Sequence, residues 1–508
     1  MTIQIATAPQ SAATIRIPGR LTPAVLELAE QPLAVEISPS ALENVAACWE
    51  FVTRRLEDGT PVYDSITGLG PLVDFTDDTP ALDGHGIIDH SAADPRDGLS
   101  PRVVRAAVLV RLWALTQGRS GVSVSVPRAL AAMLRTDFAP AVPGPEPLWA
   151  NGDLTSRYLA DALRGYGHAY TSGLRLPAAE ALAAAGLTPV SFDGRDRLAL
   201  ANNATVTVAA AGLALAAIRR SHSAAIAVTA VLIDLLGHDP GFLLNHLLDA
   251  PGPPDAAAAS TRIRDLLRGT TPRSARSARE DSSLRGAAEL LDSLGSSLWR
   301  VGTVVDSELN GIGDSPLFFP EHGTVVHSDN YFDHPIALVG HLLAMGTEQL
   351  GNLAERQLGL IFDPHHSGDL PDMVDTDPDT RNRLQDMRCA ASATLATMRG
   401  GVVLPPTDNA RSDGHNPDAN LAGMRTALNA LDRAARLRWL HGALAIALGQ
   451  MVRVGGRRPT APACAAILDA LIEAAPSFGS GGPMDQQVRT AAAQLDIIAD
   501  TLPSSEHS

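Results

Sequence analysis

The spacing of apolar residues along the chain predicts a mainly helical protein. Residues 101–117 carry valine, leucine and alanine at the intervals expected of a half-buried helix. Residues 204–217 and 223–236 are almost wholly apolar, which indicates helices buried inside a large bundle rather than membrane spans. Further long helical patterns occupy residues 332–359, 383–398, 421–454 and 486–501.

Few segments have the composition of β-strands. Residues 33–37, 122–126, 301–305 and 324–326 are expected to form short strands. Long stretches rich in Pro, Gly and Asp lie between the helical patterns, and such loops on a rigid bundle are where functional sites usually lie. We therefore expect two parts: an irregular N-terminal domain that carries the site loops (1–203) and a helical bundle with oligomer interfaces (204–508).

The composition is that of a globular protein, and it excludes several kinds of chemistry. Of the 508 residues, 45% are hydrophobic and 19% are charged, and the formal net charge is −16. This charge disfavours nonspecific binding to nucleic acid or to an anionic membrane surface. Lysine is absent, so all 40 residues counted as Lys or Arg are arginine. The chain therefore lacks the amine for a pyridoxal phosphate Schiff base and the lysine of a P-loop.

The histidine and cysteine positions do not indicate a metal site. The three cysteines lie far apart in the sequence, at no metal-ligand spacing. His365 and His366 are adjacent, so their side chains would point apart on regular backbone, and we expect structural or surface histidines. Residues 1–10 have no signal-peptide pattern, and the cysteines are then expected to be reduced thiols in a cytoplasmic protein.

Two short segments carry the first candidate chemistry. Tyr63 begins a turn-rich segment, Tyr-Asp-Ser-Ile-Thr-Gly-Leu-Gly, at residues 63–70. The second segment reads Ala-Asn-Gly-Asp-Leu at residues 150–154 and leads into an amphipathic pattern. Taken alone, the tyrosine would be a packing residue and the second segment a helix cap, because Asn and Asp accept hydrogen bonds from free helical N–H groups.

Together these segments resemble the histidine/phenylalanine ammonia-lyase superfamily. Its tyrosine loop reads roughly Tyr-Gly-x-Asn-Thr-Gly-Phe-Gly, and its hallmark triad is Ala-Ser-Gly followed by Asp-Leu. Further matches occur in the family's order, at residues 89–91, 111–121, 198–202, 283–285, 308–317, 330–331, 355–356 and 415–420. The resemblance implies a mainly α, ammonia-lyase-like fold in which an irregular N-terminal domain precedes a long central helical bundle.

The resemblance also implies which residues form the site. In the family, the triad cyclises and its serine loses water, which gives methylidene-imidazolone, an electrophile that activates an amino acid for loss of ammonia. The loop tyrosine is the general base and corresponds to Tyr63; the arginine that binds the carboxylate corresponds to Arg285. Other expected substrate-binding residues are His90, Asn202, Ser282, Glu289, Asn330, Tyr331 and Asn416.

The chain departs from the family at the residue that makes the electrophile. Asn151 stands in place of the triad serine, and its carboxamide has no hydroxyl to eliminate. Methylidene-imidazolone is therefore not expected, and no other cofactor is indicated. Ser282 replaces a tyrosine and Pro417 a glutamine, whereas Tyr63 and Arg285 are retained. These changes speak against the ordinary ammonia-lyase reaction.

Three interpretations remain open. In the first, the chain is a lyase-like enzyme without the prosthetic group, which uses Tyr63 and Arg285 on an amino-acid-like carboxylate. Such a substrate would have an already acidified proton or a better leaving group than ammonia. In the second, Asn151 and Gly152 form a succinimide electrophile. The Gly152 nitrogen attacks the side-chain amide of Asn151 and expels ammonia. In the third, the chain is a non-catalytic binding or regulatory protein.

The resemblance further implies an oligomer. Members of the family are homotetramers whose sites draw residues from three chains, so Tyr63 would meet Arg285 only across a subunit boundary. The substrate itself is not specified by the sequence. His90 favours a pocket of the histidine or tyrosine type, and the polar residues Ser282, Glu289 and Tyr331 indicate a pocket more hydrophilic than a phenylalanine site.

Overall fold

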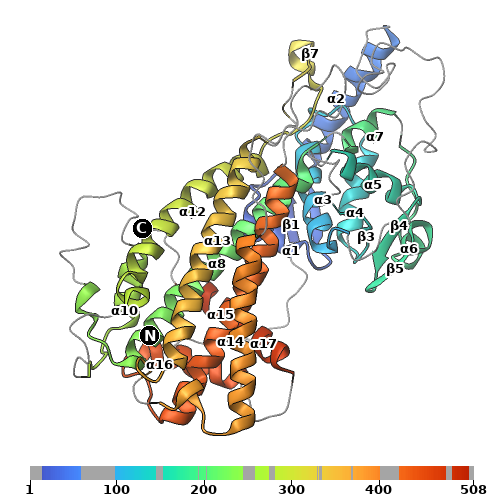
Figure 1. The fold of residues 1–508 in the computed structure, drawn as a ribbon. Helices are drawn as coiled ribbons and strands as arrows, with labels where there is room; N and C mark the ends of the chain where they lie inside the picture. The colour runs from blue at the N-terminus through green and yellow to red at the C-terminus, as the bar shows by residue number, and fades with distance from the viewer. Residues whose placement is uncertain are drawn as a thin grey trace. The chain divides into compact units, whose positions relative to one another are not determined.

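The computed structural model describes most of the chain. The described residues are 14–58, 98–144, 153–192, 194–201, 203–243, 258–273, 281–328, 330, 334–367, 370–400, 423–475 and 483–502. Within them, helices predominate, which confirms the predicted mainly α fold class (Figure 1).

Contacts within the chain group it into two units, each made of three segments. Unit 1 comprises Met1–Leu213, Thr303–Gly340 and Leu404–Leu428. Unit 2 comprises Ala214–Gly302, His341–Val403 and Asn429–Ser508. This grouping differs from a single cut in the chain, and the domain boundary between residues 203 and 204 stays a prediction.

Unit 1 contains short helices and small sheets. Its helices are α1 (Pro23–Leu28), α2 (Pro39–Glu57), α3 (Pro101–Leu115), α4 (Ser125–Leu134), α5 (Asp153–Leu163), α6 (Ala178–Ala184), α7 (Gly194–Ala201) and the 3-10 helix η5 (Pro320–His322). Strands β1 (Thr14–Ile17) and β2 (Ala34–Ile37) pair in parallel. Strands β3 (Ala139–Pro140), β4 (His168–Thr171) and β5 (Leu174–Pro177) form an antiparallel sheet, as do β6 (Leu317–Phe319) and β7 (Thr324–Val326).

Helix α3 forms the core of unit 1. Ser100 caps its N-terminus by accepting a hydrogen bond from the Val103 N–H group, and Pro101 occupies the first turn, where no N–H is needed. All residues from Val103 to Leu115 are buried. Among them is Arg105, only 2% exposed, whose guanidinium donates hydrogen bonds of 2.6–3.0 Å to the carbonyl groups of Ala29, Gln31, Leu134, Thr136 and Phe138.

Long helices make up unit 2. Four of them continue into unit 1 along the chain: α8 (Thr205–Leu236), α12 (Ala287–Leu309), α13 (His334–Phe362) and α15 (Gly423–Gly455). The others are η4 (Pro240–Leu243), α10 (Ala258–Leu266), α11 (Ser282–Arg285), η6 (Asp372–Val374), α14 (Pro378–Gly400), α16 (Pro462–Ala474) and α17 (Met484–Thr501).

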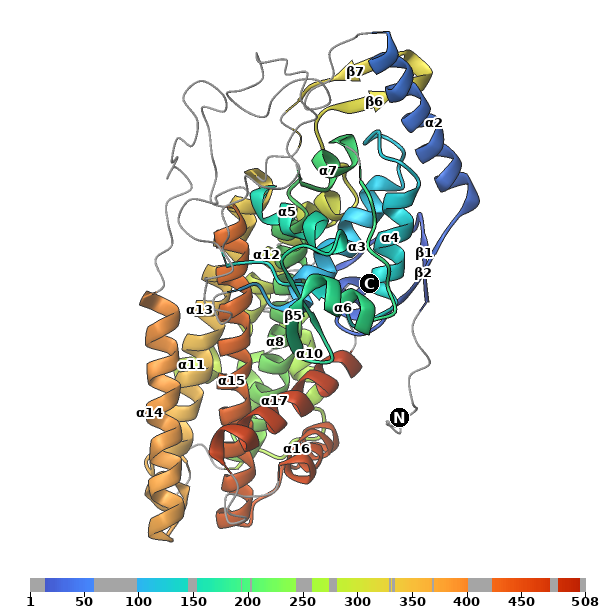
Figure 2. The same cartoon turned by 90° about the vertical axis from the view of Figure 1, so that its right-hand side faces the viewer.

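Close helix packing in unit 2 depends on small residues. A Cβ atom at Gly351 of α13 would lie 3.0 Å from Cδ1 of Leu395 in α14 and 3.5 Å from Cδ1 of Leu440 in α15. Figure 2 shows α14 running alongside α13, with α15 next to them. Glycine at this position therefore lets three helices of the bundle approach one another.

The predicted elements are confirmed in most places and wrong in two. The strands expected at 33–37 and 324–326 correspond to β2 and β7, and the apolar patterns at 204–217 and 223–236 belong to the single helix α8. Residues 301–305 are not a strand but part of α12, since Val301 and Val305 lie one helical turn apart and both are buried. Residues 122–126 are not a strand either, because α4 begins at Ser125.

Among the described residues, one segment within Arg195–Leu236, the range that contains α8, is long and apolar enough to span a membrane. The most apolar window of that stretch is 94% buried inside the protein.

Two buried histidines in unit 2 should make the stability of the fold depend on pH. Nε2 of His222 in α8 is 2.7 Å from the Leu291 carbonyl oxygen, and His441 in α15 is 2% exposed. Burial lowers the pKa of each imidazole from 6.5 to about 4. As the pH falls from 6.5 towards 4, the unfolded chain therefore takes up protons that the folded chain excludes, and stability decreases.

We expect the free energy of unfolding to fall by about 1.5 kcal/mol for each histidine between pH 6.5 and pH 5. Urea unfolding of the wild type and of His441→Gln at several pH values measures this effect, because glutamine does not titrate. A His441→Gln curve with the full wild-type slope would contradict the assignment.

Candidate active site

The short helix α11 carries two of the predicted site residues. The N–H groups of Leu284 and Arg285 donate to the Asp281 carbonyl oxygen at 3.0 and 2.9 Å, which closes the turn. Leu284 is 1% exposed and anchors the turn in unit 2, whereas Ser282 and Arg285 are exposed. The buried leucine thus holds a serine and an arginine at the surface, where a ligand can reach them.

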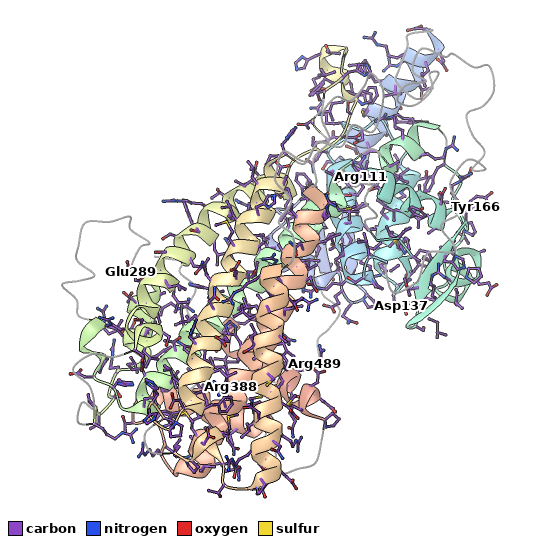
Figure 3. All side chains as sticks on the ribbon, in the orientation of Figure 1. Arg111, Asp137, Tyr166, Glu289, Arg388 and Arg489 are labelled. Carbon is purple, nitrogen blue, oxygen red and sulfur yellow. The ribbon has the colours of Figure 1, made fainter. Side chains whose placement is uncertain are left out.

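Glu289 follows one turn later, at the start of α12. It is exposed, and Figure 3 shows it on the outer side of that helix. The structure therefore brings Ser282, Arg285 and Glu289 to consecutive turns of one segment, as the sequence order predicts.

A buried glutamine positions α11, and the sequence analysis did not identify it. Gln357 of α13 is 1% exposed, and its Nε2 donates to the Ser283 carbonyl oxygen at 3.1 Å and to Thr229 Oγ1 of α8 at 2.9 Å. A single amide group therefore connects three helices of unit 2. Its position directly after the family-like Glu-Arg pair at residues 355–356 is the only signal that the sequence offers.

A carboxylate–imidazole pair fixes the other end of α11. Asp281 occupies the N-cap position, yet its side chain makes no capping hydrogen bond to the helix. Instead, its Oδ2 lies 2.8 Å from Nδ1 of His366, and Nε2 of His366 lies 3.8 Å from Oδ2 of Asp363. His366, expected to be a structural or surface residue, is partly exposed and bound to the segment that carries Arg285.

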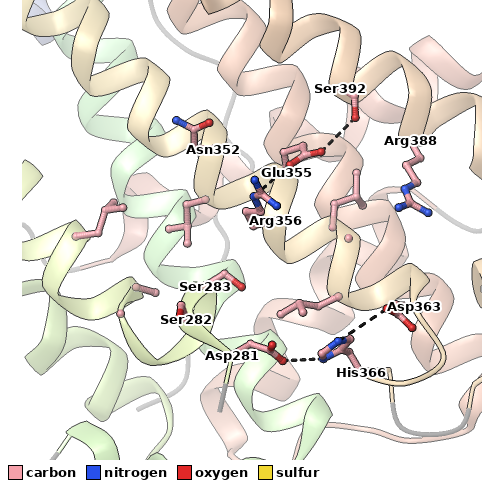
Figure 4. A pocket seen from close by; sticks show the side chains of 17 residues that line it. Asp281, Ser282, Ser283, Asn352, Glu355, Arg356, Asp363, His366, Arg388 and Ser392 are labelled. Atoms are coloured by element: carbon pink, nitrogen blue, oxygen red, sulfur yellow. Dashed lines mark hydrogen bonds and ion pairs between the residues drawn. The ribbon is translucent and has the colours of Figure 1, made fainter. Parts of the chain in front are cut away.

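A pocket of about 660 Å³ opens beside α11 in unit 2 (Figure 4). Its lining includes Ser282 and Ser283 of α11 but not Arg285. Charged side chains around it come from the Asp281 segment, from α13 and from α14, namely Asp281, Glu355, Arg356, Asp363, His366 and Arg388. The volume is within the range of small-molecule sites.

In unit 1, a buried ion pair supports the segments that flank other predicted site residues. Nη2 of Arg111 is 2.8 Å from Oδ2 of Asp314, both side chains are fully buried, and the same guanidinium donates to the Ala199 carbonyl oxygen of α7. Figure 3 labels Arg111 within this unit. Helix α7 ends directly before Asn202, and it packs against α5, which begins directly after Gly152.

A second group of contacts ties α7 to the same core. Arg195 donates from Nε to the Ser120 carbonyl oxygen at 2.9 Å and lies 3.9 Å from Oδ1 of Asp314. Asp196 accepts hydrogen bonds of 2.8 Å from the N–H and the hydroxyl of Ser123. These interactions hold the helix that precedes Asn202.

The remaining predicted site residues are placed only in part. Asn330 of unit 1 is exposed, and its Nδ2 donates to the Ile312 carbonyl oxygen. The other predicted residues, Tyr63, His90, Asn151, Gly152, Asn202, Tyr331 and Asn416, lie outside the described residues. Within the described residues, no group of three or more His, Cys, Asp and Glu side chains could hold a metal ion.

Comparison with known proteins finds one family model, two histidine ammonia-lyases and a tyrosine aminomutase that resemble this chain. The family described as aromatic amino acid lyase matches residues 22–473. A histidine ammonia-lyase from Symbiobacterium thermophilum is 27% identical over 492 residues, covering 95% of each chain. A histidine ammonia-lyase from Aromatoleum aromaticum is 31% identical over 368 residues, covering 70% of this chain and 69% of the relative. The crystal structure of a tyrosine aminomutase from Streptomyces globisporus superposes with a TM-score of 0.83 at 23% identity, covering 96% of this chain and 97% of that one.

Proposed function

Because the chain belongs to the aromatic amino acid lyase family, we propose that it is a lyase-like enzyme that acts on an amino-acid-like carboxylate without methylidene-imidazolone. One observation carries the proposal. Tyr63 and Arg285 stand at the base and carboxylate-binding positions of the family, while Asn151 stands where the electrophile would form. The firm attachment of α11 supports the role of Arg285, because a well-held arginine binds a carboxylate with little loss of freedom.

The residues at positions 150–152 do not fit the family's prosthetic group. Its exocyclic carbon arises when a serine loses its hydroxyl as water, and the Asn151 side chain ends in a carboxamide. The proposed reaction therefore uses no prosthetic group, and only unmodified side chains of the chain act on the substrate.

In the proposed reaction, Tyr63 acts as the phenolate, and its oxygen accepts the proton from the substrate's β-carbon to become the hydroxyl. The electron pair of the broken C–H bond forms the double bond, and the bond from the α-carbon to the leaving group breaks, so that the leaving group departs with its electron pair. Arg285 holds the carboxylate through two parallel N–H···O bonds. No electrophile binds the departing amine in this reaction. The substrate must therefore carry a quaternary ammonium group or another leaving group better than ammonia, or its β-proton must already be acidic.

A substrate panel tests this proposal. The full-length protein is incubated with L-histidine, L-tyrosine and L-phenylalanine, and with the trimethylammonium form of each, and the unsaturated acid is detected by mass spectrometry. We expect turnover of at least one trimethylammonium substrate and slower or no turnover of its parent amino acid. Faster turnover of the parent amino acids would contradict the proposal.

The mass of the protein tests the absence of the prosthetic group. We expect the intact mass to equal that of the sequence, with no loss of water, although ring closure and serine dehydration in the family each release one water molecule. Asn151→Ser restores the family's triad and is the matched control. Loss of water from the wild type would disprove the proposal, and loss of one ammonia at residues 151–152 would instead indicate the succinimide electrophile.

Arg285→Gln should lower kcat/KM by about 10- to 100-fold, because a charge-assisted bidentate contact to the carboxylate is lost. The substrate's carboxamide analogue provides the control. The wild type should convert the carboxamide with a low kcat/KM, and Arg285→Gln should lower that value little further. Equal losses for the carboxylate and the carboxamide would show that Arg285 acts elsewhere.

A non-catalytic role is the second candidate. The substitutions Asn151, Ser282 and Pro417 fall together in motifs that form the family's reactive site, which favours a binding or regulatory protein that has kept the fold. Saturable binding of a panel compound with no product from any of them would support this candidate. In either case we propose a homotetramer in which Tyr63 and Arg285 of different chains meet.

A further inference from the structure

The pocket beside α11 has an unusual distribution of charge. In the view of Figure 4, the side chains of Arg356 and Arg388 lie above a row formed by Asp281, His366 and Asp363. Glu355 lies beside Arg356, so one part of the pocket holds groups of both signs, and the row below it carries two carboxylates and the imidazole of His366.

Ion pairs within the protein neutralise the two arginines weakly or not at all. Arg356 is 74% exposed, and its Nε is 3.9 Å from a carboxylate oxygen of its sequence neighbour Glu355. Such an exposed pair contributes little. Arg388 of α14 is exposed and has neither a hydrogen bond nor an ion pair with the part of the chain that the structure describes. These guanidinium groups are therefore free to bind an anionic group of a ligand.

The carboxylates of the pocket favour a ligand that also carries a positive charge. Asp281 and Asp363 flank His366, and Glu355 accepts a hydrogen bond of 3.2 Å from Ser392. Three carboxylates would repel phosphate or a dicarboxylate, whereas an ammonium group would relieve their mutual repulsion. The volume of about 660 Å³ also exceeds what an inorganic anion fills, and apolar groups of Ala287, Leu290 and Leu360 line the remainder.

We propose that this pocket, which includes Ser282 but not Arg285, is a second binding site for a zwitterionic amino acid with an apolar side chain. Arg356 and Arg388 hold its carboxylate, and one of the two carboxylates that flank His366, Asp281 or Asp363, accepts hydrogen bonds from its ammonium group. The proposed function supplies only the class of ligand, since Arg285 does not line the pocket. Because Ser282 and Ser283 line it, an occupied pocket would contact the same short helix that presents Arg285.

Equilibrium dialysis of the full-length protein tests the site with three probes. These are L-phenylalanine, 2-phenylethylamine, which lacks the carboxylate, and 3-phenylpropanoate, which lacks the ammonium group. We expect L-phenylalanine to bind, and each singly charged analogue to bind at least about tenfold more weakly.

Variants distinguish this pocket from the reactive site. Arg388→Gln should weaken L-phenylalanine binding about tenfold or more, whereas Arg381→Gln, an exposed arginine on the same helix outside the pocket, should leave it unchanged. Arg285→Gln should leave one bound L-phenylalanine per chain with unchanged affinity, although the proposed reaction, and any binding at the reactive site, would be weakened. The experiment therefore distinguishes failure of the proposed reaction from failure of the proposed binding site.

Four results would overturn the inference. One is the absence of L-phenylalanine binding to the wild type. Another is binding that is lost in Arg285→Gln but kept in Arg388→Gln, because the probe would then occupy the reactive site. A third is equally tight binding of 3-phenylpropanoate, which would indicate a simple anion site. The fourth is a change in the molecular mass of Arg388→Gln in solution, which would show that this arginine holds a second copy of the chain.

Discussion

Replacing Tyr63 with phenylalanine is expected to reduce kcat for any substrate of the chain by about 10²- to 10⁴-fold, the range that general-base catalysis supplies. The substitution removes one hydroxyl group and keeps the ring, so that packing around residue 63 changes little. The loss should fall on kcat, because the phenolic oxygen acts on the β-proton in the transition state and not on the bound carboxylate.

The measurement is a full rate profile of the wild type and Tyr63→Phe, with substrate carrying hydrogen or deuterium at the β-carbon. A slower reaction of the deuterated substrate shows that breaking the C–H bond limits the rate. Tyr166→Phe is the matched control, since Tyr166 is 59% exposed and packs only its ring against Arg164. If Tyr63→Phe retained the wild-type kcat, another group would have to be the base.

Substrate binding by the same variant distinguishes an enzyme from a non-catalytic binding protein. Binding of the substrate to Tyr63→Phe should remain close to that of the wild type, because Arg285 is intact. Loss of binding together with turnover would mean that Tyr63 shapes the pocket rather than moves a proton. Such a result would favour the non-catalytic alternative, in which retention of the tyrosine reflects recognition alone.

The long helices could be predicted from the sequence because their apolar residues repeat at the helical period over many turns. The pattern at 383–398 lies within α14, and the described part of the pattern at 421–454, residues 423–454, lies within α15. Short β-branched runs were ambiguous: Val301 and Val305 have strand-forming side chains, but their spacing also fits one buried face of α12. Strands β3 to β5 escaped prediction because each is stabilised by pairing with its neighbours rather than by a pattern of its own.

The candidate site could be predicted only where a motif is continuous in sequence. Ser282 and Arg285 were predicted as site residues in this way; the structure places both on α11, and their role stays a prediction. The residues that hold α11 come from far along the chain. Gln357 is 74 residues from Ser283, and His366 is 85 residues from Asp281. Local spacing carries no information about such pairs, because only the packing of α13 and the segment after it against α8 and α11 brings them together.

A different residue should dominate the stability of unit 1. Arg105→Leu is expected to lower the free energy of unfolding by about 3–5 kcal/mol, because it removes the donor that satisfies buried carbonyl groups at the ends of α1 and α4. Burial lowers the pKa of Arg105 to about 10, so the guanidinium still carries its charge at neutral pH. The carbonyl oxygens that accept its hydrogen bonds stabilise this buried charge. Leucine fills part of the space but offers the carbonyl groups no hydrogen bond.

Urea unfolding followed by circular dichroism measures this loss, with Arg128→Leu as the control. Arg128 lies on the exposed side of α4, close in sequence to the same carbonyl groups, and its replacement should change the midpoint little. Arg105→Lys should recover only part of the loss, because an ammonium group presents three donors at one point, whereas the guanidinium reaches carbonyl groups from Ala29, directly after α1, to Phe138, directly before β3. Equal midpoints for Arg105→Leu and Arg128→Leu would mean that water satisfies the carbonyl groups, and that the charge of Arg105 contributes nothing to holding α1, α3 and α4 together.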